Sequence, residues 1–249
     1  MKLALMSDIH ANIQAFDACI AHACAQGAEQ FAFLGDFVGY GADPVAVLNR
    51  IQALAGKGAL LVKGNHDEMA VRPPAKSLSM GDSTASWTHA QLDSSQLDFL
   101  DKLPLTLEHG SMALVHASLD RPELWRYVTD PRAATASLDA LVSPQIRHVF
   151  GGHVHQQTLY YRGADARMMR FAPTPGVAIP LPRHRHWLAT LGSVGQPRDG
   201  NPKAMYALFD SCRLQLAFQR VDYDHQSAAA AIRQAGLPAF FADRLGSGE

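Results

Sequence analysis

Polar residues that can bind a metal or transfer a proton follow several short apolar runs of this chain. The segments that stand directly after such runs are Asp8-Ile9-His10, Gly35-Asp36, Gly64-Asn65-His66-Asp67, His116 and Gly152-His153-Val154-His155. In open α/β sheets the carboxyl ends of the strands line the crevice that binds ligands. We therefore expect these polar segments to converge at one site.

The residue types in these segments favour a metal centre. Carboxylate oxygens, imidazole nitrogens and an amide oxygen together suit Mn, Fe or Zn better than the oxygen-only sites of Ca and Mg. In extended chain, residues two apart share a face, so Asp8 with His10 and His153 with His155 are expected to point into one crevice. A single such histidine would more often be a buried side chain satisfied by hydrogen bonds.

The elements that must position these residues begin with parallel β-α units. Short apolar runs predict buried strands at residues 3–6, 30–34 and 59–62. Asn12 is expected to cap a helix that Gly27 ends, and Asp43-Pro44 starts a second helix. This order of strands and helices predicts parallel strands joined by right-handed crossovers.

The rest of the chain is expected to be richer in antiparallel strands. After the break at Arg72-Pro73-Pro74, residues 83–100 are predicted to be helical, and residues 224–235 are predicted to form a helix. Strands are predicted at residues 106–109, 112–116, 147–150, 158–161, 168–171, 187–190, 205–209 and 214–221. The predicted fold class is α/β, with two packed mixed β-sheets flanked by helices in a single domain over residues 1–249.

Composition excludes several classes of protein. The chain has 249 residues, 47% of them hydrophobic, which is enough for an ordinary core. The net charge of −1 argues against a dedicated nucleic-acid or membrane-surface binder, and no apolar run is long enough to span a membrane. The three scattered cysteines do not suggest disulfides, so we expect a cytoplasmic protein. The 12 histidines are the unusual feature.

The order of the polar motifs resembles a known family. Asp-x-His, Gly-Asp, Gly-Asn-His-Asp, a lone His and Gly-His-x-His are similar, in this sequence, to the motifs of the calcineurin-like metallophosphoesterases. The resemblance spans residues 3–155. It continues through residues 192–200, Gly-Ser-Val-Gly-Gln-Pro-Arg-Asp-Gly, which resemble a small bacterial branch of predicted phosphodiesterases.

The resemblance implies a centre with two divalent cations, of which Mn²⁺ is favoured and Fe or Zn is possible. One cation would be held by Asp8, His10, Asp36 and His155, and the other by Asp36, Asn65, His116 and His153. A hydroxide bridging the metals would attack phosphorus in line, and His66 would protonate the leaving oxygen as the general acid. Two divalent cations against two carboxylates leave a positive surplus that attracts an anionic phosphoester.

A departure from the family pattern bears on the substrate. Protein serine/threonine phosphatases carry Asp-Arg-Gly after the second motif, where this chain has Val38-Gly39-Tyr40-Gly41. Only Lys63, among the lysines, stands immediately beside a motif. We therefore expect a phosphodiesterase that acts on a small, singly charged phosphoester. A phosphomonoesterase or a nucleoside-polyphosphate hydrolase is the first alternative, and a metal-binding scaffold without catalysis is the second.

Several residues near the motifs have two interpretations. Asp67 either orients the acid or caps the following turn, and Tyr40 either lines the cleft or packs in the core. Arg121, Trp125 and Tyr127 either shape a substrate rim or form ordinary surface. The basic residues 183–186 are expected to be a solvated loop rather than a phosphate-binding patch.

Overall fold

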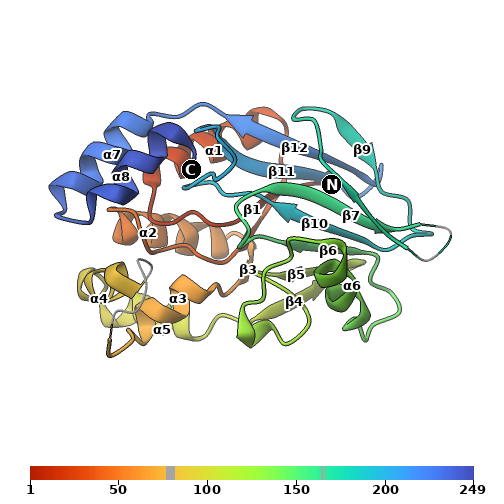
Figure 1. Ribbon diagram of the computed structural model, residues 1–249, viewed down its shortest axis with the longest axis horizontal. Coiled ribbons are helices and arrows are strands. Elements are labelled where there is room, and N and C mark those ends of the chain that lie inside the picture. The colour runs from red at the N-terminus through yellow and green to blue at the C-terminus, as the bar shows by residue number, and fades with distance from the viewer. Residues whose placement is uncertain (77–81, 164, 166) are drawn as a thin grey trace.

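Two mixed β-sheets pack face to face between layers of helices in the computed structural model, which describes residues 1–76, 82–163, 165 and 167–249 (Figure 1). Within these residues the first sheet has the order β3 (Leu60–Val62), β2 (Gln30–Leu34), β1 (Lys2–Met6), β11 (Ala204–Asp210), β12 (Gln215–Val221) and β9 (Ala178–Pro180). The second has the order β4 (Thr106–His109), β5 (Met112–Val115), β6 (His148–Gly151), β10 (Trp187–Leu191), β7 (Gln157–Arg162) and β8 (Met168–Phe171). The predicted fold class is confirmed.

The first sheet joins strands from both ends of the chain. β1 pairs with β2 in parallel and with β11 antiparallel, so Leu3 lies opposite both Gln30 and Phe209. In the second sheet β6 is parallel to β5 and β10, and β7 is antiparallel to β10. This interleaving supports our proposal that residues 1–249 form one domain.

The core follows the two-residue period of the strands. Leu3 and Leu5 of β1 point toward the second sheet and share an apolar cluster with Phe150 of β6. Ala4 and Met6 point the other way and pack with the residues of the covering helices. Successive side chains of a strand point to opposite faces, so β1 contributes to both layers of the core.

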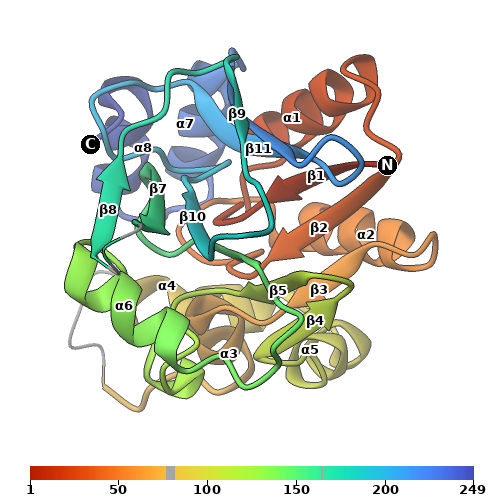
Figure 2. The same ribbon diagram turned by 90° about the vertical axis from the view of Figure 1, so that its right-hand side faces the viewer.

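Helices cover the outer faces of both sheets. Figure 2 shows α1 (Ile13–Ala25) and α2 (Pro44–Ala55) beside the first sheet and α6 (Pro131–Asp139) beside the second. α7 (His225–Gln234) and α8 (Ala239–Ser247) pack together at one end through a cluster of their own. Asn12 caps α1 as predicted, because its Oδ1 accepts a hydrogen bond from the Ala15 N–H at 3.0 Å. Among the described residues no helix is both long and apolar enough to cross a membrane.

The helical prediction for residues 83–100 is confirmed except at Leu92 and Asp93, where the chain breaks into two helices. α4 (Asp82–Gln91) and α5 (Ser94–Asp101) are separate helices, because Asp93 starts a new one. The Asp93 carboxylate accepts from the Gln96 N–H at 2.8 Å, and the Gln96 side chain accepts from the Asp93 N–H at 3.3 Å. This reciprocal capping box satisfies backbone donors that a continuous helix would have paired internally.

Among the described residues, five elements were not predicted from the sequence. They are α3 (Asn65–Val71), the 3-10 helix η1 (Pro122–Leu124), α6, β9 and α8. α6 begins after Asp130 with Pro131 at its first position, the same start signal as Asp43-Pro44 of α2. The start signal of α6 was therefore present in the sequence. The helix was missed because it has only 9 residues and buries few apolar side chains.

Removal of the α5 cap is expected to destabilise the fold. Asp93→Ala should lower the free energy of unfolding by about 1 kcal/mol, since the carboxylate that accepts from the Gln96 N–H and from Ser95 Oγ at 2.7 Å is lost. Urea unfolding followed by circular dichroism measures this change. The matched control is Asp98→Ala, which removes only an exposed pair with Lys102 at 3.9 Å and should change the stability by less than about 0.5 kcal/mol. Equal effects of the two variants would contradict the capping role.

Candidate metal centre

The polar motifs follow the carboxyl ends of strands in both sheets. Asp8 and Asp36 come two residues after β1 and β2, which are parallel neighbours in the first sheet. His116 and His153 follow β5 and β6, which are parallel neighbours in the second sheet. Because the sheets pack face to face, these strand ends meet, and all of the predicted ligands come together at one buried site.

One cluster of donor atoms forms around His155. Its Nε2 lies 3.1 Å from Oδ1 of Asp8 and 3.1 Å from Nε2 of His10. Nε2 of His10 lies 3.8 Å from Oδ2 of Asp36. These side chains are buried, with Asp8 fully excluded from solvent. The four residues are those that the family resemblance assigns to the first cation.

A second cluster forms around His116. Its Nε2 lies 3.1 Å from Oδ1 of Asn65, 3.1 Å from Nδ1 of His153 and 3.3 Å from Oδ2 of Asp36. These are the four residues predicted for the second cation. Oδ2 of Asp36 is therefore the one carboxylate oxygen that both clusters share.

The hydrogen bonds of the histidine rings leave nitrogen lone pairs directed into the clusters. Nδ1 of His10, His116 and His155 each faces a backbone carbonyl, of Val38 at 3.3 Å, Leu34 at 2.7 Å and Gln196 at 2.6 Å respectively. A neutral ring that donates its Nδ1 proton to a carbonyl presents an unprotonated Nε2, which is the form that binds a metal. Against the effect of burial, the charge of Asp36 raises the pKa of His116 to about 9, so this ring would release a proton when a cation binds.

Two features of the buried donors fit bound cations. Where both neutral rings donate their Nδ1 protons to carbonyls, the Nε2 atoms of His10 and His155, 3.1 Å apart, both carry lone pairs and cannot hydrogen-bond to each other. Oδ1 of Asp8 is buried and has no hydrogen-bond partner among the described residues. Buried polar atoms of this kind are costly unless a partner is supplied. The combination of nitrogen and carboxylate donors suits a divalent transition metal at each cluster.

The backbone at the site is left-handed at five of the seven predicted ligands. Positive φ angles occur at Asp8 (56°), His10 (50°), Asp36 (53°), His153 (66°) and His155 (60°). The paired residues do point into one site as predicted, but the reason given, extended chain, is wrong. Left-handed non-glycine residues cost of order 1 kcal/mol or more each and persist where packing or function holds them.

Glycines allow the motif loops to approach one another. A Cβ atom at Gly64 would overlap the backbone nitrogen and Oδ1 of Asp36, and one at Gly152 would overlap Ser7 and Oδ2 of Asp8. A side chain at either position would displace a predicted ligand. The absence of a Cβ at these two places is therefore part of the site geometry.

Asp67 fastens two motif loops together. Its Oδ2 accepts from the N–H groups of Asp36 and Gly64, both at 2.9 Å, and its Oδ1 accepts from Phe37 N–H at 2.8 Å. Burial and the charge of Asp36 raise the pKa of Asp67 to about 7, while these donors favour the carboxylate. These hydrogen bonds match neither predicted role directly: Asp67 holds the residue before α3 and the Asp36 loop, rather than the turn that follows it or the His66 ring.

His66 lies beside the first cluster and is buried. Its ring centroid lies 5.1 Å from that of His10 and 4.3 Å from that of Tyr40, and its backbone N–H donates to Oδ1 of Asp36 at 2.8 Å. Burial lowers the pKa of His66 to about 3. Since donor atoms of His10, Asp36 and His66 lie within 4.8 Å of one another, distance alone does not separate His66 from the ligands.

Aromatic side chains border the site on two sides. The Tyr127 ring stacks on His153 with centroids 4.0 Å apart, and Trp125 meets His116 edge-on at 5.9 Å. A cavity of about 440 Å³ opens beside the second cluster, lined by Asn65, Glu68, Met69, Arg72, Trp125, Tyr127 and His153. The rim interpretation of Trp125 and Tyr127 is therefore favoured. Arg121 is not among the residues that line this cavity.

Sequence reasoning gave no role to Arg198, which lies near the centre. The Arg198 guanidinium lies 5.7 Å from the centroid of the Tyr40 ring, which in turn lies 4.5 Å from the His10 ring. Lys63, the lysine that stands beside a motif, is engaged elsewhere, because its Nζ donates to the Asp101 carbonyl at 2.8 Å. Arg198 belongs to the Gly192–Gly200 stretch, so the signal lay in a segment already singled out.

Comparison with known proteins identifies relatives over the whole chain. Residues 1–213 match the model of the calcineurin-like phosphoesterase superfamily domain. The chain is 30% identical over 249 residues to the uncharacterized protein MJ0912 of Methanocaldococcus jannaschii, covering 98% of this chain and 96% of that protein.

Two solved structures share the fold. A metallophosphoesterase from Sphaerobacter thermophilus superposes with a TM-score of 0.87 at 30% identity, covering 100% of both chains. A hypothetical protein, PH1004 from Pyrococcus horikoshii OT3, gives a TM-score of 0.76 at 20% identity, with 100% of this chain and 98% of that one covered. With the family match, the fold and the two histidine–carboxylate clusters in agreement, the chain belongs to the calcineurin-like phosphoesterase superfamily.

Proposed function

We propose that this protein is a phosphodiesterase with a dinuclear metal centre. The observation that carries the proposal is the sharing of Asp36 Oδ2 by the two clusters, at 3.8 Å from His10 Nε2 and 3.3 Å from His116 Nε2. Two bound divalent cations would lower the pKa of water and hold the phosphoryl oxygens for in-line displacement. Asp36 would then be the residue that sets the spacing of the two cations.

Each cation would be held by the four residues of its cluster. His10, His116 and His155 would bind through Nε2, because their Nδ1 atoms face carbonyl groups. His153 would bind through Nδ1, which lies 3.1 Å from Nε2 of His116. The mixed nitrogen and oxygen donors favour Mn²⁺, with Fe and Zn as alternatives. The free thiols of Cys19, Cys24 and Cys212 are consistent with a cytoplasmic protein.

We propose His66 as the general acid. Its side chain extends from the first turn of α3, next to the ligand Asn65, and its ring lies against His10. Burial keeps the ring neutral in the absence of ligand. A negatively charged phosphoester placed beside it would stabilise the protonated ring, so that the proton is available for the leaving oxygen.

The charged side chains around the two clusters favour a phosphodiester as the substrate. Among the described residues, no Lys or Arg forms an ion pair with any of the predicted ligands. The positive charge of the metals alone is enough to stabilise a singly charged phosphoryl group. A doubly charged phosphoryl group would bind more tightly if a Lys or Arg side chain also contacted it. A phosphomonoester or a nucleoside polyphosphate remains the alternative substrate class, and a non-catalytic scaffold is the alternative from another class.

Substitution of His66 separates proton transfer from metal binding. His66→Asn should lower kcat by about 10²–10⁴-fold while both metals stay bound, because the acid is lost and the ligands remain. Metal content is measured by mass spectrometry of the purified variant, alongside its rate. His184→Asn, in an exposed loop, is the matched control and should behave as the wild type. A loss of one metal equivalent in His66→Asn would show that His66 is a ligand.

Diester preference is tested with two substrates that share a leaving group. With Mn²⁺, bis(p-nitrophenyl) phosphate should be hydrolysed with a higher kcat/KM than p-nitrophenyl phosphate, since the diester carries a single negative charge. Initial rates at one fixed concentration of free Mn²⁺ measure the ratio. A monoester preference of tenfold or more, equivalent to about 1.4 kcal/mol, would contradict the proposed substrate class. No hydrolysis of either ester by the metal-loaded protein would favour the scaffold alternative.

A further inference from the structure

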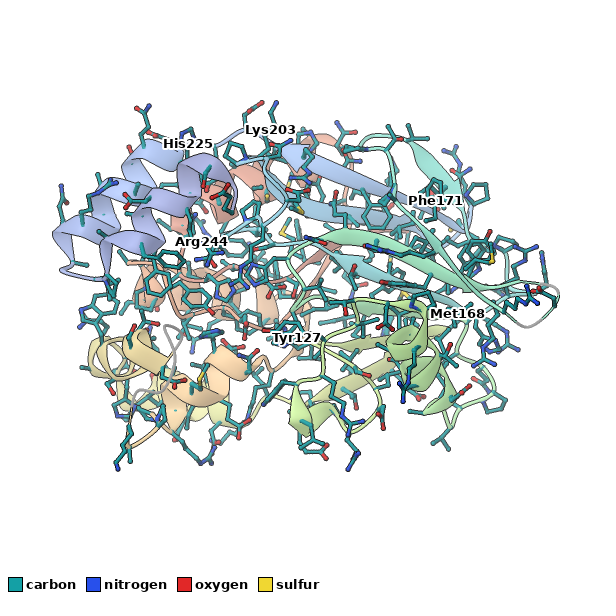
Figure 3. All side chains as sticks on the ribbon, in the orientation of Figure 1. Tyr127, Met168, Phe171, Lys203, His225 and Arg244 are labelled. Atoms are coloured by element: carbon teal, nitrogen blue, oxygen red, sulfur yellow. The ribbon has the colours of Figure 1, made fainter. Side chains whose placement is uncertain are left out.

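Two arginines lie on the Tyr40 side of the centre, and among the described residues neither forms an ion pair with an Asp or Glu side chain. Arg198 stands in the loop after β10, and Arg244 stands on α8. In Figure 3 the Arg244 side chain points from α8 toward the middle of the molecule. Neither residue has a role in the function proposed above.

Arg198 is held in place by a neutral group. Its Nη2 and Nε donate to Oε1 of Gln196 at 2.7 and 3.3 Å, and the guanidinium faces the Tyr40 ring. Gln196 is itself buried, and its carbonyl oxygen faces Nδ1 of His155. The segment that carries Arg198 is thus fixed directly to a predicted ligand of the first cluster.

The same packing brings α8 close to Arg198. The Phe241 ring lies 4.8 Å from the Tyr40 ring, and Arg244 is three residues later on the same face of α8. The Gly200 N–H donates to the Gly248 carbonyl at 2.9 Å, which ties the Arg198 loop to the end of α8. Burial lowers the pKa of Arg244, and the positive charge of Arg198 acts in the same direction.

The acidic neighbours of both arginines are engaged elsewhere. Asp199 follows Arg198 but forms its ion pair with Arg220. Asp243 precedes Arg244 but pairs with Arg233 at 2.6 Å. Among the described residues neither Arg198 nor Arg244 has an Asp or Glu side chain within ion-pair distance, and Arg244 Nε donates to the Glu249 backbone oxygen instead. The Arg244 guanidinium also packs over the Phe240 ring at 4.9 Å, and the charge of Glu249 favours its charged form. The charge of Arg198 still opposes that form, and a bound anion would offset the repulsion between the two arginines.

We propose that Arg198 and Arg244 together bind a second phosphoryl group of the substrate, next to the phosphoryl group held at the metal clusters. Guanidinium groups match phosphate oxygens in geometry and bind them through charge-assisted hydrogen bonds. Tyr40 contacts His66 and His10 on one side and Arg198 on the other, so the second group lies on the His66 side. The substrate class is then a phosphodiester that carries a second phosphoryl group beside the reacting one, and this inference rests on the proposed function.

Calorimetric binding of two non-hydrolysable anions tests the pair. The Mn²⁺-loaded protein is titrated with inorganic phosphate and with methylenediphosphonate, which carries two linked phosphoryl groups, at one fixed concentration of free Mn²⁺. In the wild type the diphosphonate should bind more tightly than phosphate. In Arg198→Gln and in Arg244→Gln this advantage should shrink by about tenfold or more, since each variant removes charge-assisted hydrogen bonds. Arg213→Gln, an exposed arginine in the β11–β12 turn, is the charge-matched control.

The calorimetric results can overturn the proposed second phosphoryl site in two ways. An unchanged ratio of the two dissociation constants in both variants would overturn it. An equal weakening of phosphate and diphosphonate would place the arginines on the reacting phosphoryl group and would also overturn the second-group assignment. If Arg198→Gln does not fold, Arg198→Lys and Arg244→Gln give the same comparison. Failure of the proposed function is seen separately, as absence of hydrolysis of bis(p-nitrophenyl) phosphate by the wild type.

Discussion

A single carboxylate oxygen, Oδ2 of Asp36, lies within 4 Å of a histidine nitrogen from each of the two clusters, and the geometry of the site depends on it. The other oxygen of Asp36 is occupied by the backbone N–H of His66 at 2.8 Å. The backbone N–H of Asp36 is held by Asp67, and Gly64 leaves the room that its carboxylate needs. Each of these contacts limits the motion of one carboxylate, which is what a shared ligand of two cations requires.

The two packed sheets supply the positions that this arrangement needs. Neighbouring parallel strands deliver Asp8 and Asp36 from the first sheet and His116 and His153 from the second. Strand ends alone do not aim the side chains, and left-handed backbone at five predicted ligands does so. The free-energy cost of these conformations is offset by the apolar core between the sheets, in which Leu3, Leu5 and Phe150 are fully or almost fully buried. Fold stability and site geometry are therefore coupled.

The sequence was sufficient for the fold class and for the members of the candidate site, because both leave local signals. Apolar runs predicted the central strands, and polar motifs after those runs predicted which residues converge. It was not sufficient for the pairing of β1 with β11, which joins residues more than 200 positions apart and has no local signal. The short helix α3 was missed because its residues were interpreted only as a motif. Arg198 was missed because its proximity to Tyr40 depends on how the 192–200 loop packs.

The measurement that tests the central claim most directly is anomalous X-ray scattering from crystals grown with Mn²⁺. The account predicts two Mn²⁺ peaks in each chain, about 3.5–4 Å apart and on either side of the Asp36 carboxylate. One peak should lie among Asp8, His10 and His155, and the other among Asn65, His116 and His153. A single peak, or two peaks that do not share Asp36, would contradict the dinuclear centre.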